Sequence, residues 1–176
     1  MAEWRVAVAG APRTGKSAFV VSCMRGEYVG RHAERRDEAE PIPLADGRLF
    51  RLRMIECRSE RELRECACHA ALLLYDHRRA ASTSAELLDR WYPAVPPEAR
   101  RNLLLCGTKK RRGDACPEKL ATFAYVRDLT HFDVSARTRN NLDEVVLWLA
   151  RRLLGDDDLR LAGVSNATEL RRKRNQ

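Results

Sequence analysis

The chain has 176 residues, of which 44% are hydrophobic, and this suits one globular domain with a substantial core. No apolar run approaches the roughly 18 residues of a membrane span, and the N-terminus leads into a strand rather than a signal peptide, so we expect a cytoplasmic protein. The net charge of +8 does not indicate a nucleic-acid-binding protein, because the arginines are scattered along the chain without interleaved aromatic residues. We therefore expect no DNA or RNA partner.

The N-terminal segment predicts a strand, a tight loop and a helix. Apolar residues 6–9 precede the loop 10–17, in which Gly10 and Gly15 allow backbone conformations that are closed to residues with a Cβ. Consecutive N–H groups can then surround an anion at a helix N-terminus, with Lys16 at the β- and γ-phosphates and Ser17 at Mg²⁺. The alternative is a strand-to-helix turn that binds nothing. The pattern G-x-x-x-x-G-K-[ST], in this strand–loop–helix setting, favours a nucleotide phosphate site.

The next segments predict a helix, an exposed connection and a hairpin. Helical spacing of apolar residues continues over residues 16–25, and the following glycine ends the helix. Residues 31–40 contain almost no apolar side chains, so we expect an exposed and mobile connection. Residues 42–44 and 49–55 flank Asp46-Gly47, a strong turn signal, and predict an antiparallel pair.

Three strands and three helices are expected in the second half. The apolar runs over residues 70–75 and 102–107 predict buried strands, and residues 129–134 predict a last strand. The helix signals are the capping-box pairs Thr83 with Glu86 and Asn141 with Glu144, a proline start at Pro117, and stops at Pro93 and Gly155.

This order of elements predicts an α/β fold with a doubly wound, mostly parallel sheet of six strands, one antiparallel edge strand, and helices on both faces. Residues 1–155 form the domain. Residues 156–176 are charged and end in the basic run 171–174, so we expect a largely disordered C-terminal tail.

Four motifs resemble the Ras superfamily of small GTPases, of the Ras or Rab type, over residues 5–154. They are the loop 10–17, Leu72-Leu73-Leu74-Tyr75-Asp76 at the family's central strand, Gly107-Thr108-Lys109 where the family has Gly-Asn-Lys, and Val134-Ser135-Ala136-Arg137-Thr138 where it has Thr-Ser-Ala-Lys-Thr. The resemblance implies a P-loop NTPase G domain that binds GTP or GDP with Mg²⁺ and acts in signalling or trafficking through a protein partner.

The resemblance also implies the nucleotide contacts. Lys109 would lie along the base with the edge of Tyr28 beside it, and the backbone of Ser135 and Ala136 would meet the guanine carbonyl. Ser17 would bind Mg²⁺ directly, and Glu56 would bind it through a water. The complete implied set is Gly10, Ala11, Pro12, Arg13, Thr14, Gly15, Lys16, Ser17, Ala18, Tyr28, Thr108, Lys109, Arg111, Ser135, Ala136 and Arg137.

The base-reading motif departs from the family. Arg111 stands where the family has the aspartate that accepts two hydrogen bonds from guanine. A guanidinium only donates, so we expect weak selection between guanine and other bases, unless Asp114 reaches the base through a rearranged loop.

The switch motifs depart further. No threonine occurs between Ser17 and Ser82 to bind Mg²⁺ from the first switch. In the second switch, Ser59 replaces the glycine that senses the γ-phosphate, and Glu60 replaces the catalytic glutamine. We therefore expect weak or absent GTP hydrolysis.

The expected function is that of a small GTPase-like nucleotide-binding protein that acts through a protein partner. Two alternatives remain open: an active GTP/GDP switch with GTPase activity, and a nucleotide-free pseudo-GTPase scaffold. The family usually ends in a prenylated cysteine, but no cysteine follows Cys116, so we expect no direct lipid anchor. The basic run 171–174 would allow weak contact with an anionic membrane, and a partner could recruit the protein to a membrane or the nucleus.

Overall fold

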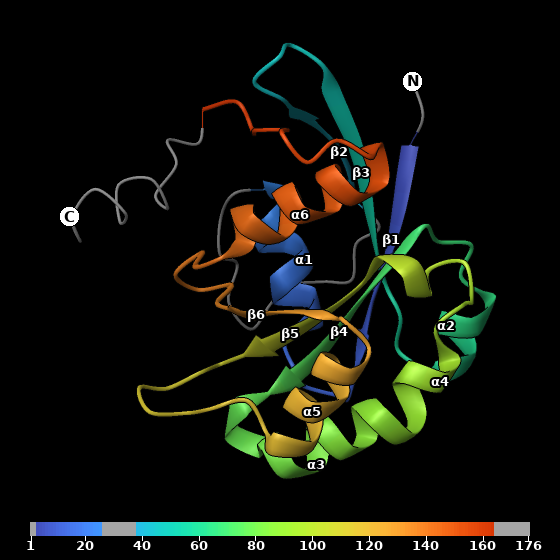
Figure 1. The fold of residues 1–176 in the computed structure, drawn as a ribbon, viewed down its shortest axis with the longest axis vertical. Coiled ribbons are helices and arrows are strands. Elements are labelled where there is room, and N and C mark those ends of the chain that lie inside the picture. Colours follow the sequence, from blue (N-terminus) through green and yellow to red (C-terminus); the bar gives the residue numbers. More distant parts are fainter. Residues whose placement is uncertain (1–2, 26–37, 164–176) are drawn as a thin grey trace.

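The computed structural model describes residues 3–25 and 38–163, which fold around a sheet of six strands (Figure 1). The strand order is β2-β3-β1-β4-β5-β6, and only the pair β2 and β3 is antiparallel. The strands are β1 (Glu3–Gly10), β2 (Glu38–Pro43), β3 (Leu49–Glu56), β4 (Ala70–Asp76), β5 (Leu103–Thr108) and β6 (Thr130–Val134). The prediction of a mostly parallel α/β sheet with one antiparallel edge strand is confirmed.

Helices cover both faces of this sheet. On one face lie α1 (Lys16–Arg25) and α6 (Leu142–Leu154); on the other lie α2 (Glu60–Glu65), α3 (Ala80–Glu86), α4 (Tyr92–Ala94) and α5 (Glu118–Val126) (Figure 1). Short 3-10 turns, η2 (His77–Arg79) and η4 (Arg100–Asn102), and a π-helical segment, η3 (Leu87–Trp91), complete the described elements. No helix among the described residues is long and apolar enough to cross a membrane.

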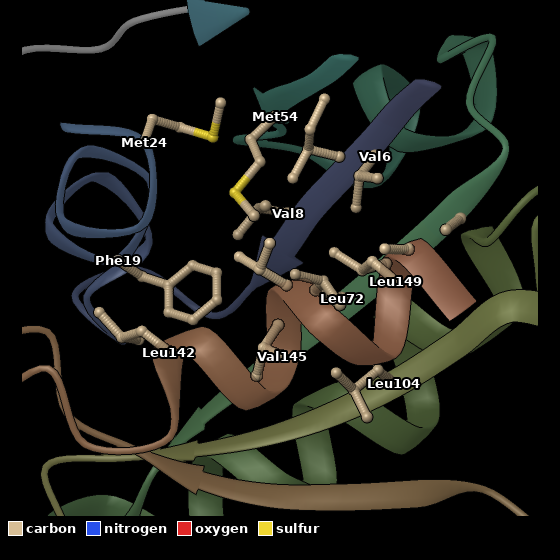
Figure 2. Packing of buried hydrophobic residues seen from close by; sticks show 14 of the residues in the cluster. Val6, Val8, Phe19, Met24, Met54, Leu72, Leu104, Leu142, Val145 and Leu149 are labelled. Atoms are coloured by element: carbon tan, nitrogen blue, oxygen red, sulfur yellow. The ribbon is translucent and has the colours of Figure 1, made fainter. Parts of the chain in front are cut away.

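The strand side chains divide between two cores because successive residues of a strand point to opposite faces. Val8 and Leu72 pack against Phe19 of α1 and against Leu142 and Val145 of α6, as Figure 2 shows. The residues next to them in the strands join the opposite core, with Leu63, Trp91 and Leu120 from the helices on that face. Both faces are buried, which explains why the central strands read as continuous apolar runs.

The edge strand β2 begins earlier than the sequence indicated. It starts at Glu38, so residues 38–40 belong to the sheet rather than to the predicted mobile connection. Its backbone pairs with β3 from Glu38 opposite Met54 to Pro43 opposite Leu49. A strand at the edge of a sheet tolerates prolines and needs few apolar residues, so its sequence carried little strand signal.

Both predicted capping boxes are wrong in detail. After β4, the turn η2 begins at His77 and the helix α3 begins at Ala80. Thr83 therefore lies inside α3 rather than before it. Its hydroxyl donates to the carbonyl of Arg79 at 2.9 Å. Asn141 does precede α6, but it has a left-handed backbone (φ 58°), and its Nδ2 donates to the carbonyl of Asp133 at 2.7 Å. In both cases a tertiary or backward hydrogen bond replaces the local cap.

The first part of the expected tail belongs to the folded body. After Gly155 ends α6, Leu159 and Leu161 are buried against the core. The backbone of this segment forms hydrogen bonds with the β2–β3 hairpin. Ala45 N donates to Arg160 O, and Ala162 N donates to Pro43 O, both at 2.9 Å. Figure 1 shows the segment running from α6 to the β2–β3 hairpin. Residues 164–176, including the basic run, lie outside the described residues.

Candidate functional site

An open cavity of about 1160 Å³ lies where the central strands reach their carboxyl ends. It is lined by Arg13, Thr14, Gly15, Lys16, Ser17, Ala18, Glu56, Arg78, Lys109, Lys110, Arg111, Ser135, Ala136 and Arg137. The loops after β1, β5 and β6 meet here because parallel strands end at the same edge of the sheet. The structure therefore brings together most of the residues that the sequence analysis assigned to one site.

The loop 10–17 is shaped by two glycines. Gly10 has a φ of 141°, and a Cβ at this position would lie 2.2 Å from the carbonyl oxygen of Leu74 in β4. Gly15 has a φ of 98°, a region that residues with a Cβ rarely adopt. Gly10, Ala11 and Pro12 do not line the cavity, but their backbone supports it.

Three side chains hold this loop by donating hydrogen bonds to its backbone carbonyls. The Thr14 hydroxyl is buried and donates to the carbonyl of Ala11 at 2.9 Å. Arg79 donates to the carbonyl of Pro12 at 2.8 Å. Thr108, predicted to belong to the site, is buried and does not line the cavity; its hydroxyl donates to the carbonyl of Thr14 at 2.7 Å and joins the end of β5 to the loop. The loop shape is thus fixed by several distant segments.

Lys16 is the most buried cation of the cavity, with 8% of its surface exposed. Its Nζ donates to the carbonyls of Gly10 at 2.8 Å and Ala11 at 3.1 Å. Burial lowers the pKa of this ammonium below its usual value. Lys16 also begins α1, whose first N–H groups have no intrahelical acceptors. A buried cation beside a helix N-terminus is a suitable environment for phosphate.

Ser17 and Glu56 both line the cavity and are joined by a hydrogen bond. The Ser17 hydroxyl donates to Glu56 Oε2 at 2.8 Å, and Glu56, the last residue of β3, is 6% exposed. Mg²⁺ usually binds proteins through one or two oxygen ligands, waters and substrate phosphates. The described residues contain no group of three acidic, histidine or cysteine side chains that could hold a metal alone. This pair fits a Mg²⁺ ion that takes most of its ligands from a nucleotide and water.

Lys109 connects the loop to the end of β4. Its Nζ donates to Asp76 Oδ2 at 2.8 Å and to the carbonyl of Arg13. Arg78 also donates to the Asp76 carboxylate, whose side chain is 1% exposed. Burial acts to raise the pKa of Asp76, but the hydrogen bonds from Arg78 and Lys109 outweigh it and hold the pKa below its usual value. The stem of Lys109 is therefore held along one wall of the cavity.

Asp114 does not line the cavity. Its carboxylate accepts the backbone N–H of Arg111 at 2.8 Å and so closes its own loop. Arg111 does line the cavity, as expected. The cavity wall at this point presents a hydrogen-bond donor and no carboxylate acceptor from this loop.

Glu60, which stands at the position of the catalytic glutamine, does not line the cavity. Its Oε1 lies 2.5 Å from Nε of Arg90 in η3. Ser59 is the N-cap of α2, and its hydroxyl accepts the N–H of Glu62 at 3.2 Å. Tyr28 and residues 26–37 of the first-switch region lie outside the described residues.

The sequence analysis missed Arg78 and Lys110 as lining residues. Arg78 follows β4 by two positions, and Lys110 follows β5 by two positions, so both lie just past the carboxyl end of a buried strand. That placement is a usable signal in a parallel sheet. Lys110 Nζ is 2.5 Å from Asp133 Oδ2 of β6.

No protein-family model matches this sequence.

Proposed function

We propose that this cavity binds a nucleotide through its phosphates with Mg²⁺, and that the chain is a small GTPase-like G domain with weak or absent GTP hydrolysis. The observation that carries the proposal is the convergence of buried Lys16 and the Ser17–Glu56 pair in one cavity with Lys109 and residues 135–137. The domain would act by presenting its surface to a protein partner in signalling or trafficking.

Each residue has a role that follows from its contacts. Lys16 would exchange its carbonyl partners for phosphate oxygens, and the first turn of α1 would supply N–H donors. Ser17 would offer its hydroxyl to Mg²⁺, and Glu56 would hold a magnesium-bound water. When bound, Mg²⁺ would supply positive charge that neutralises the phosphate oxygens. Lys109 would lie against the base with its alkyl stem.

The base would be selected weakly under this proposal. Arg111 cannot accept the two protons that guanine presents at its N1 and amino groups. The Asp114 carboxylate, which could accept them, already accepts a backbone N–H of its own loop. GTP is the expected nucleotide from the resemblance, and ATP should compete with it.

Two observations favour this proposal over an active switch. The Glu60 side chain pairs with Arg90 instead of reaching the cavity, and Ser59 is used as a helix cap. A positioned group that orients the attacking water is normally required for fast phosphoryl transfer to water. The cationic lining and the buried Lys16 favour it over an empty scaffold, because a cavity lined by more cationic than anionic side chains is stabilised by an anionic ligand.

The test is the nucleotide content of the purified protein after denaturation, measured by chromatography. We expect bound nucleotide in the wild type and none in Lys16→Ala. Lys119→Ala is the matched control, because Lys119 is exposed on α5, outside the cavity lining. Equal nucleotide content in Lys16→Ala and in the wild type would contradict the phosphate site. Absence of binding by the folded wild type to added GTP and ATP would favour the scaffold.

A further inference from the structure

Three cysteines lie together where the α2 segment crosses one face of the sheet. Cys57 directly follows β3, Cys66 caps the C-terminus of α2, and Cys68 lies two residues before β4. Cys57 and Cys68 are buried in the core on this face, and the partly exposed Cys66 packs against the same core. The strand between β3 and β4 is β1, which contributes the small side chain of Ala7 to this core and so leaves room for the thiols.

The three thiols contact one another and are reduced. Hydrogen bonds join the side chain of Cys66 to those of both Cys57 and Cys68. All three are free cysteines. Within the part of the chain that the structure describes, no group of three histidine, cysteine or acidic side chains is arranged to hold a metal ion. The cluster is therefore better suited to thiol chemistry than to metal binding.

Cys66 has the surroundings of a reactive thiol. Cys57 and Cys68 are only 1% and 4% exposed, so Cys66 is the member of the cluster that solvent reaches. The hydrogen bonds with Cys57 and Cys68 lower the pKa of Cys66 below its usual value, and the charge of Arg5 acts in the same direction, whereas burial acts to raise it. Because the thiolate is the nucleophile, an oxidant reacts first with an accessible thiol of low pKa.

We propose that Cys66 is an oxidation site, at which a hydroperoxide forms a sulfenic acid that Cys57 converts into a Cys57–Cys66 disulfide. This inference is independent of the proposed nucleotide site, since none of the three cysteines lines the cavity. A Cys66–Cys68 disulfide would close a ring around a single residue, whose backbone has little freedom to reach disulfide geometry. A Cys57–Cys66 disulfide encloses the whole of α2, and the longer backbone has more freedom to reach that geometry.

The reaction needs only the hydroperoxide as a second reactant. The Cys66 sulfur attacks one oxygen of the hydroperoxide; an S–O bond forms, the O–O bond breaks, and the leaving oxygen takes a proton from solvent. The Cys57 sulfur then attacks the Cys66 sulfur; an S–S bond forms, the S–O bond breaks, and hydroxide leaves as water with the Cys57 proton. Two electrons pass from the two thiols to the hydroperoxide. A dithiol reductant restores both thiols by thiol–disulfide exchange.

The experiment treats the full, reduced chain with equimolar hydrogen peroxide at neutral pH, in the presence of a chelator that prevents metal-catalysed oxidation. Remaining thiols are then blocked with N-ethylmaleimide, and the protein is digested with trypsin for mass spectrometry. Trypsin places Cys57 in the peptide 54–58, and Cys66 and Cys68 together in the peptide 65–78. We expect a disulfide link between these two peptides that a reductant cleaves.

Cys116 serves as an internal control for selectivity. It is also partly exposed, but burial raises the pKa of its thiol. We expect free Cys66 to disappear about tenfold faster than free Cys116, or faster still, because a larger fraction of Cys66 is thiolate at neutral pH. Equal rates at the two cysteines would overturn the proposal that Cys66 is a selective oxidation site.

Two alanine variants identify the thiol that reacts with oxidised Cys66. Cys57→Ala should lose the link and leave Cys66 as a sulfenic acid that dimedone traps. Cys68→Ala is the matched control, because Cys68 is also buried and hydrogen-bonded to Cys66, and it should keep the link. Circular dichroism checks that both variants fold, and the wild-type digest is informative without either of them.

The remaining outcomes would overturn the role of Cys57. Loss of two hydrogen atoms within the peptide 65–78, with no link to the peptide 54–58, would show a Cys66–Cys68 disulfide. A link that disappears in folded Cys68→Ala would place it between Cys57 and Cys68. Oxidation of wild-type Cys66 that ends at the sulfenic or sulfinic acid would show that no second thiol reacts with it. Each of these results leaves the nucleotide site untouched, and a failure of the nucleotide site leaves this proposal untouched.

Discussion

Glu60 Oε1 lies 2.5 Å from Arg90 Nε, and this contact fixes the start of α2 against η3 on the face of the sheet opposite α1 and α6. The two residues come from separate segments, and neither lines the cavity where a nucleotide would lie. A partly exposed pair of this kind contributes about 1 kcal/mol or less to folding. The Glu60–Arg90 pair therefore matters more for the chemistry of the cavity than for the stability of the fold.

The first prediction is that Glu60→Gln does not restore GTP hydrolysis. The side chain at this position faces Arg90, so a glutamine there would still be far from the attacking water. We expect the rate of phosphate release to stay within about twofold of the wild type in single-turnover assays. An increase of about tenfold or more would mean that α2 reorients when nucleotide binds.

The second prediction concerns Mg²⁺. Glu56→Gln should weaken the dependence of nucleotide affinity on Mg²⁺, because an amide is a poorer ligand for a magnesium-bound water than a carboxylate. The measurement is nucleotide affinity with Mg²⁺ and with a chelator. Glu118→Gln, at an exposed position on α5, is the control and should behave like the wild type. An undiminished Mg²⁺ effect in Glu56→Gln would exclude Glu56 from the metal site.

The third prediction is that GTP and ATP bind with affinities within about tenfold of each other, since no carboxylate of the 108–114 loop is left to read guanine. Arg111→Asp should raise the preference for GTP. Competition between the two nucleotides gives the ratio directly. A preference for GTP of about a thousandfold in the wild type would contradict the role given to Arg111.

How far the sequence could predict this site depends on the range of the interactions. The loop 10–17 is encoded locally, since its two glycines, the apolar strand before it and the lysine and serine after it are adjacent in the chain. The position of the Glu60 carboxylate depends on its pairing with Arg90, and the position of the Asp114 carboxylate depends on the conformation of its own loop. The Glu60–Arg90 contact joins distant segments, so no local pattern specifies it. For Asp114, the sequence left open whether its carboxylate would reach the base.

The difference between local and long-range interactions also explains which parts of the fold could be predicted. Continuous apolar runs identified β4 and β5 because a strand buried on both faces needs apolar side chains at every position. Leu159 and Leu161 are isolated apolar residues in a charged segment, and their burial depends on the β2–β3 hairpin that accepts them. Thr83 satisfies a capping pattern in sequence, but its hydroxyl bonds backward to Arg79.

The fourth prediction comes from a polar cluster over Gly107. Three neighbouring strands place Tyr75, Gly107 and Asp133 side by side, and a Cβ on Gly107 would lie 2.7 Å from Tyr75 OH and from Asp133 Oδ1. His77 Nε2 is 2.7 Å from Asp133 Oδ1, and His131 Nε2 is 3.0 Å from Tyr75 OH. Glycine at position 107 is what allows these side chains to meet.

This cluster should make the protein less stable in acid. Burial lowers the pKa of His131 below its ordinary value of 6.5, although Asp133 acts to raise it. The unfolded chain then takes up the proton more readily, so stability is present above pH 6.5 and declines as the pH falls below it. One such group contributes a slope of at most about 1.4 kcal/mol per pH unit.

The measurement is the free energy of unfolding in urea between pH 8 and 5. His131→Gln should flatten the decline, whereas His69→Gln, which changes an exposed histidine, should retain it. If the free energy of unfolding depends on pH in the same way in His131→Gln and in the wild type, this cluster does not cause the loss of stability in acid.

The last prediction is that α2 does not respond to the γ-phosphate. A ligand shifts a conformational equilibrium only through its different affinities for the two states. Here α2 is held by the Ser59 cap, by the fully buried Leu63 and by the Glu60–Arg90 pair. None of these four side chains lines the cavity. Amide exchange over residues 60–65 should therefore be the same with a diphosphate and with a non-hydrolysable triphosphate, as it should be in α6. Protection of α2 by the triphosphate alone would show that other residues sense the γ-phosphate, and the active switch would then be the better account of this protein.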